Sequence, residues 1–251
     1  MKPYTDHFSR VASSYAECRP RYPAALFAYI SRLPRGHDLA WDCAAGSGQA
    51  TLPLTRSFRR VLATDVSPAM LELAPRHPAI EYRVSRAEDS GLTDASVDLV
   101  TVAQALHWLD LEAFYGEVDR VLVPGGILAA WSYTRQQLDD AALDAMLTRF
   151  YIDEVGPYWP EERRHVEAGY RTLPFPYDEL AGPPIYMEEH WTLPELLGYL
   201  GTWSATQRFR EVEGYDPVAP FGVELGQRWG NPALAHVVRW PLSLRVGRKP
   251  G

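Results

Sequence analysis

The stretch LAWDCAAGSGQATLPL, residues 39–54, predicts a short buried strand, a turn of small residues and the start of a helix. Gly46 and Gly48 in the turn allow the backbone to adopt positive φ and to approach a ligand closely. The helix that follows presents free N–H groups and the positive end of its dipole. The stretch therefore indicates a loop that cradles a nucleotide-like cofactor, although Ala44 and Ala45 stand where many such loops carry glycine.

Asp42, just before the loop, bears on which cofactor is bound. A carboxylate there would repel the pyrophosphate of a dinucleotide but would attract an ammonium group. S-adenosylmethionine (SAM) carries an ammonium group and no phosphate, so the charge of Asp42 favours SAM over NAD. The alternative without a ligand is a plain tight turn, with Asp42 as a solvent-exposed strand end.

Strands and helices alternate over residues 38–134. The expected helix at 67–77 opens with Ser67 as N-cap and Pro68 at its first position. Apolar strands that alternate with helices are typical of a parallel sheet covered on both faces, so we expect an α/β fold. Ligands of such sheets bind at the carboxyl ends of the strands. The expected strands are 38–44, 60–66, 80–88, 96–106 and 127–133, and the other expected helices are 48–58 and 110–122.

Three further segments flank this core, and we expect them to form a single domain with it. Residues 1–37 are predicted to be an N-terminal helical cap. Residues 135–184, rich in Tyr, Trp, Pro and charge, are predicted to be a mostly helical or irregular lid or insertion without a sixth strand. Residues 185–251 are predicted to complete the sheet, with strands at 185–193 and 236–247 around a helix at 194–209. Pro241 indicates that the last of these strands lies at an edge or is bulged.

Composition restricts the classes of function. The chain has 251 residues, with 25 Lys and Arg against 32 Asp and Glu, and this net charge of −7 argues against a dedicated nucleic-acid-binding protein. The two cysteines lack metal-type spacing and Cys43 is expected in the core, so no metal site is predicted. No apolar run has the length of a membrane span or the form of a signal peptide. We therefore expect a cytoplasmic enzyme that binds neither membranes nor nucleic acid.

Polar residues also follow the second and third predicted strands. Asp65 ends the second strand, where a carboxylate can accept hydrogen bonds from both ribose hydroxyls of either cofactor. Its charge could instead serve the N-terminus of the next helix. Ala87 and Glu88 follow the third strand, where an adenine could lie against the backbone, or where an ordinary loop could expose the glutamate.

Gln104, His107 and Trp108 cluster at the end of the fourth predicted strand, where the chemistry of such a sheet is expected. His107 could orient or deprotonate an acceptor, or it could be a packing histidine. Trp108 could form an apolar wall of the pocket or belong to the core. These two residues are the candidates for catalysis, through positioning or as a base.

Four segments together resemble the class I SAM-dependent methyltransferases of type 11: WDCAAGSG, ATDVSPAML, SRAEDSGLTDASVDLVTVAQALHWLD and RVLVPGGILAAW. Three others, FSRVASSYAECRPRYP, LLGYLGTWSA and VVRWPLSLRVGRK, are similar to the trans-aconitate methyltransferase-like branch of that family. The resemblance covers nearly the whole chain and is weakest over residues 135–184.

The resemblance implies a Rossmann-like, seven-stranded, mostly parallel sheet of order 3-2-1-4-5-7-6, with the last strand antiparallel, helices on both faces and a helical lid. It implies residues 38–134 as the SAM-binding core and S-adenosylhomocysteine as the product. The residues that match the family's cofactor-binding positions are Tyr15, Arg19, Asp42, Ala44, Gly46, Gly48, Asp65, Val66, Met70, Ala87, Glu88, Gln104 and Ala105, with Tyr22 beside Tyr15 and Arg19 in a cap over the ligand. Two positions depart from the family: Ala44 stands where glycine is usual, and Arg86 stands where an aspartate usually contacts the adenine amine.

The reaction that the resemblance implies is in-line methyl transfer from SAM, in which the protein mainly orients the acceptor. A carboxylate acceptor would need no base, whereas a phenol or amine would need one, with His107 as the candidate. We expect a small-molecule acceptor, because the segment with Tyr151, Tyr158, Trp159 and Tyr170 is long enough to form a lid over a closed pocket.

Two other functions stay open from the sequence. The first is an NAD-linked oxidoreductase, whose glycine motif the segment GSGQAT only approximates. The second is a SAM-binding protein without catalytic activity. The sequence carries no indication of the oligomeric state.

Overall fold

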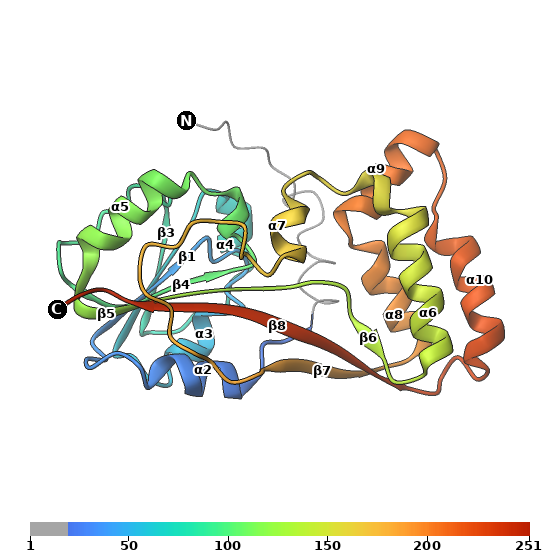
Figure 1. Cartoon of the computed structure of the whole chain (residues 1–251), viewed down its shortest axis with the longest axis horizontal. Coiled ribbons are helices and arrows are strands. Elements are labelled where there is room, and N and C mark those ends of the chain that lie inside the picture. Colours follow the sequence, from blue (N-terminus) through green and yellow to red (C-terminus); the bar gives the residue numbers. More distant parts are fainter. Residues whose placement is uncertain (1–19) are drawn as a thin grey trace.

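The structure is a computed structural model, and it describes residues 20–251. The part of the predicted helical cap before Pro20, with the candidate cofactor residues Tyr15 and Arg19, lies outside the described residues. Figure 1 shows an α/β part and a group of helices beside it, connected by the long strand β8 (His236–Arg248), which runs from one to the other.

Seven of the strands form the predicted sheet. Strands β3, β2, β1, β4 and β5 lie parallel in that order, β8 pairs antiparallel with β5, and β7 pairs antiparallel with β8. The order of these strands and the antiparallel direction of the last one confirm the predicted fold class. The strand bounds are β1 Leu39–Cys43, β2 Arg60–Asp65, β3 Ile80–Val84, β4 Val97–Ala103, β5 Leu122–Tyr133 and β7 Tyr186–Trp191.

Strand β1 is buried at all five positions because helices cover both faces of the sheet. Trp41 packs against Phe114 of α5, with the ring centroids 6.1 Å apart, whereas Ala40 belongs to a cluster with Leu26 and Ile30 of α2. In Figure 1 α5 lies over one face of the sheet, and α2 and α3 lie over the other. The helix bounds are α2 Ala24–Ser31, α3 Thr51–Leu54, α4 Pro68–Glu72 and α5 Leu111–Val121, so α3 and α4 are shorter than predicted.

A second group of helices packs beside β7 and the start of β8 around a core of its own, which includes Leu147, Leu196, Phe221 and Trp240. The single helix predicted at 194–209 is wrong in detail, because Thr202 and Trp203 separate two helices. The helix at 218–229 was not predicted. The bounds of this group are α6 Ala141–Arg149, α8 Leu193–Gly201, α9 Ser204–Glu213 and α10 Val218–Trp229.

Two details of the sheet correct the expectations. The segment predicted to lack a strand contains the short strand β6 (Gln137–Leu138), which pairs with β8. Strand β8 is not an edge strand, because it has neighbours on both sides. Leu242 N–H donates to Ile185 O on the β7 side, so the nitrogen of the preceding Pro241 faces the opposite side of β8. That side is the gap between the end of β5 and the start of β6, where no partner within residues 20–251 needs a donor, and the proline is therefore tolerated.

The remaining short elements connect these layers. They are η2 Leu106–Trp108, the π-helical turn η3 Phe150–Glu154, η4 Gly156–Tyr158 and α7 Arg163–Glu167. No helix within residues 20–251 has both the length and the apolar composition that crossing a membrane requires.

Candidate active site

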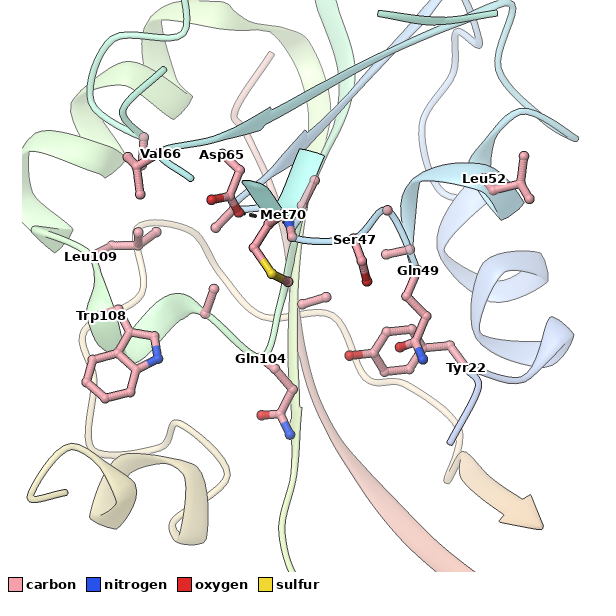
Figure 2. A pocket seen from close by; sticks show the side chains of 18 of the residues that line it. Tyr22, Ser47, Gln49, Leu52, Asp65, Val66, Met70, Gln104, Trp108 and Leu109 are labelled. Carbon is pink, nitrogen blue, oxygen red and sulfur yellow. Dashed lines mark hydrogen bonds between the residues drawn. The ribbon is translucent and has the colours of Figure 1, made fainter. Parts of the chain in front are cut away.

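A cavity of about 850 Å³ lies at the carboxyl ends of β1, β2 and β4, where the sheet topology predicts the ligand. Figure 2 shows Met70 between two walls, one with Val66, Leu109 and Trp108 and the other with Ser47, Gln49 and Tyr22. The predicted site residues that line the cavity are Tyr22, Ala44, Gly46, Gly48, Asp65, Val66, Met70, Ala87, Glu88, Gln104, Ala105, His107 and Trp108. The fold therefore brings together residues from five separate parts of the sequence.

The loop after β1 contains three residues with left-handed backbone: Ala44 with φ 55°, Gly46 with φ 56° and Gly48 with φ 76°. The backbone N–H of Gly46 donates to Asp65 Oδ2 at 2.8 Å, which ties this loop to the end of β2. A Cβ at Gly48 would lie 3.1 Å from both Ala74 Cβ and Tyr82 Oη. Gly48 thus also allows the loop to pack closely against the segment after α4.

The left-handed conformation explains why glycine is usual at position 44. An alanine pays roughly 1–2 kcal/mol to hold this conformation, whereas glycine adopts it readily but loses more chain entropy on folding. We expect Ala44→Gly to raise the free energy of unfolding by about 0.5–1 kcal/mol in urea titrations. Ala95→Gly is the matched control, since Ala95 also has positive φ (46°) but does not line the cavity. An unchanged stability of both variants would contradict this account.

Asp42 does not line the cavity, which corrects the expectation that its carboxylate faces the ligand or the solvent. The side chain is fully buried, and its two oxygens accept hydrogen bonds from Thr51 Oγ1 at 2.6 Å and from Thr101 Oγ1 at 2.7 Å. Burial raises its pKa from 3.8 to about 6, against the lowering effect of the two threonine hydroxyls. Asp42 therefore ties the start of α3 to β4 from beneath the loop.

Asp65 does line the cavity, and Figure 2 shows its carboxylate directed toward the loop after β1. Its Oδ1 accepts from Ser67 N–H and its Oδ2 from Gly46 N–H, both at 2.8 Å. A carboxylate oxygen can accept more than one hydrogen bond. The two roles that the sequence left open, ribose binding and a charge at the N-terminus of the next helix, therefore do not exclude each other.

Arg86, one of the two residues that depart from the family pattern, forms a hydrogen bond with a nearby glutamate. Its Nε donates to Glu88 Oε2 at 3.1 Å, and both residues line the cavity together with Ala87. Apolar contacts for a flat ring are available from the nearby Val66 and Met70.

Gln104, at the end of β4, has positive φ (56°), which is unusual for a residue other than glycine. Its backbone N–H donates to Trp131 O and its Nε2 donates to Tyr133 O, both at 2.9 Å. Strained residues that are held by several contacts are concentrated at functional sites. These bonds leave the amide Oε1 as the acceptor that Gln104 can offer to a ligand.

His107 lies against Tyr170 and Trp108. Its Nδ1 is 2.9 Å from Tyr170 Oη, and its ring centroid is 4.6 Å from that of Trp108. Burial, and then the positive charges of Arg163 and His165, lower its pKa to about 3. A general base works best with a pKa near the operating pH. Of the two functional roles left open by the sequence, deprotonation of an acceptor is the one that this lowered pKa disfavours.

None of the four aromatic residues named for the predicted lid segment lines the cavity. Tyr151 and Trp159 pack instead against Trp203 in the core of the helical group, and Tyr170 is buried beneath His107. From this segment Glu162, just before α7, lines the cavity. That residues 135–184 form a lid over the pocket stays a prediction.

Several lining residues were not predicted: Arg21, Ser47, Gln49, Leu109, Asp110, Tyr133 and Glu162. Tyr133 could have been found, because it ends a predicted strand at the edge where ligands bind. Ser47 and Gln49 lie within the quoted loop, where only Ala44, Gly46 and Gly48 were predicted to bind the cofactor. Glu162 has no local signal, since its position depends on how α7 packs against the sheet.

Comparisons with known proteins agree with this geometry. The family model described as the methyltransferase domain matches residues 41–130. A Dictyostelium discoideum protein assigned as a methyltransferase is 34% identical over 217 residues, which are 85% of this chain and 82% of that protein. The solved structure of a protein assigned as a type II methyltransferase from Anaeromyxobacter dehalogenans is 46% identical with a TM-score of 0.88, and the match covers 93% of this chain and 99% of that one.

Proposed function

Because the chain belongs to the class I SAM-dependent methyltransferases, we propose that it transfers the methyl group of SAM to a carboxylate oxygen of a small organic acid. The resemblance of the chain to the trans-aconitate methyltransferase-like branch also favours an organic acid. SAM supplies the activated methyl group, so the residues of the chain have to bind, orient and exclude water rather than activate the donor.

The residues that line the cavity support SAM as the methyl donor. We propose that the loop with Gly46 and Ser47 holds the methionine part, where Gln104 Oε1 is an acceptor for its ammonium group. Asp65 would accept the ribose hydroxyls, and Met70 would pack against the adenine. The left-handed backbone of Gly46, with φ 56°, supports this arrangement, because it is a conformation that glycine adopts where backbone approaches a ligand.

The protonation state of His107 is the observation on which the choice of a carboxylate acceptor rests. Its lowered pKa, about 3, leaves the imidazole neutral and a poor base at neutral pH. An amine or phenol acceptor would have to lose a proton, whereas a carboxylate is already deprotonated at neutral pH. Arg21 and Arg56 also line the cavity, and we propose that one of these guanidinium groups pairs with the anionic acceptor. The lining contains carboxylates as well, those of Asp65, Glu88, Asp110 and Glu162.

The test is methyl transfer from radiolabelled SAM to a panel of small mono-, di- and tricarboxylic acids, with the corresponding amides, amines and phenols as matched controls. We expect label in at least one acid, released by mild base as a methyl ester is. Label in an amine or phenol, and in none of the acids, would contradict the proposal. Binding of SAM in calorimetry without any labelled product would instead favour the non-catalytic SAM-binding protein.

A further inference from the structure

Tyr170 contacts the candidate catalytic residue from inside the core. Its side chain is fully buried, and its Oη lies 2.9 Å from His107 Nδ1, although 63 positions separate the two residues in the chain. The backbone that presents Tyr170 is unusual: Gly169 has φ 58° and Tyr170 has φ 63°. A tyrosine with left-handed backbone is a strained residue that persists only when its surroundings hold it.

The surroundings hold Tyr170 at several points. Its backbone N–H donates to His165 O at 2.7 Å, at the end of α7. Nη1 of Arg245, on β8, donates to Tyr170 O at 2.8 Å and to Leu173 O at 2.7 Å. Glu179 in turn accepts from Arg245 Nη2 at 2.7 Å. Strand β8 thus fixes the strained turn, and the turn fixes the phenol beneath His107.

The direction of the hydrogen bond to His107 follows from the other partner of the phenol. The backbone N–H of Leu106 donates to the Tyr170 hydroxyl oxygen, and burial raises the pKa of the phenol, so the hydroxyl stays protonated. Its own proton then points to His107 Nδ1, which accepts it. A neutral imidazole that accepts at Nδ1 carries its proton on Nε2.

Charged groups around His107 are consistent with a neutral ring. Arg163 and His165 belong to α7, which packs against η2, and their positive charges disfavour a second proton on the imidazole. Glu162, the acidic group next to them, lines the same cavity as His107. Within residues 20–251, His107 Nε2 makes no hydrogen bond.

We propose that Tyr170 is a positioning residue that holds His107 as the Nε2–H tautomer, so that His107 donates a hydrogen bond to one oxygen of the acceptor carboxylate. This inference rests on the proposed function for the identity of the acceptor. The second carboxylate oxygen then forms the new bond to the methyl carbon, the bond from sulfur to that carbon breaks, and its electron pair stays on sulfur. No proton moves in this step, so His107 acts as a donor that orients the acceptor.

The first test reads the tautomer directly and needs no substrate. Protein with ¹⁵N-labelled histidine is compared with Tyr170→Phe by NMR between pH 5 and pH 8, with the His107 signals assigned from their loss in His107→Gln. We expect a protonated Nε2 and an unprotonated Nδ1 in the wild type, and a mixture of tautomers in Tyr170→Phe. Tyr115→Phe is the matched control: Tyr115 packs against the same core cluster, and its hydroxyl donates to Pro174 O.

The second test measures the kinetic effect with an acid that the labelling panel identifies. We expect Tyr170→Phe to raise KM for the acid about tenfold with a smaller change in kcat, the scale of one hydrogen bond, and Tyr115→Phe to change neither. A protonated Nδ1 in the wild type, or a tautomer unchanged in Tyr170→Phe, would overturn the inference. The NMR result is independent of the acceptor, so it stands or falls separately from the proposal that an acid is methylated.

Discussion

Gly48→Ala is expected to lower the free energy of unfolding by about 3 kcal/mol, from left-handed strain and from crowding together. Gly48 has φ 76°, and an added Cβ would lie 3.1 Å from Ala74 Cβ and Tyr82 Oη and 3.2 Å from Pro75 Cδ. Relief of this crowding would move the loop that lines the cavity, so we also expect SAM to bind at least tenfold more weakly. Urea unfolding and calorimetric titration with SAM measure the two effects.

Gly214→Ala is the matched control for the strain alone. Gly214 has almost the same φ, 77°, but it lies at the end of α9 and an added Cβ would meet no atom within 4 Å. This variant is expected to cost roughly 1–2 kcal/mol and to leave SAM affinity unchanged. If Gly48→Ala cost no more than Gly214→Ala, the close packing of the loop against the segment after α4 would have no energetic importance.

Asp42→Asn is expected to change how stability depends on pH. The folded-state pKa of Asp42, about 6, lies above its ordinary value of 3.8, so the folded protein binds more protons between these two pH values. The contribution of Asp42 to stability is therefore fully present below pH 3.8 and is lost as pH rises to about 6. The loss corresponds to about 3 kcal/mol, because the side chain is buried.

The measurement is the free energy of unfolding of wild type and Asp42→Asn from pH 4 to pH 8. We expect the difference between the two to shift by up to about 3 kcal/mol in favour of the variant as pH rises, since a neutral amide has no charge to desolvate. The pH-dependent contribution of His107 to stability has the opposite sign, because its lowered pKa makes stability fall as pH falls below 6.5. This contribution is the same in both proteins, so it cancels in the difference between them. If the difference in the free energy of unfolding did not depend on pH, burial would impose no free-energy penalty on the ionised Asp42 carboxylate.

The fold was predictable because its signals are local. Alternating apolar strands and helices set the parallel core, and Ser67 does cap α4, accepting from Met70 N–H. The helical group was predicted less well: one helix was expected over 194–209, whereas Thr202 and Trp203 separate α8 from α9, and Trp203 is buried in the core of this group. The two-residue strand β6 exists only because β8 extends past the end of β5.

In the candidate site, too, the sequence placed one acidic residue correctly and another one wrongly. The position of Asp65 after β2 was enough to place it at the cavity, because the carboxyl ends of parallel strands meet at one edge. Asp42 stands at an almost equivalent position in its own strand, yet the inference drawn from its charge was wrong in geometry. The choice of SAM now rests on the family and on the other cavity residues rather than on that carboxylate.

The sequence by itself determined the alternation of strands and helices, the glycine-containing loop after the first strand and the resemblance to the family, since each depends on residues that are neighbours in the chain. The strand order followed from that resemblance. Only the tertiary structure decided the roles of two side chains that the sequence could not settle. Asp42 is buried because Thr101, 59 positions away, donates to it from the adjacent strand. His107 is a neutral hydrogen-bonding group because Tyr170 and α7 pack around it, and desolvation and the charges of Arg163 and His165 act through space.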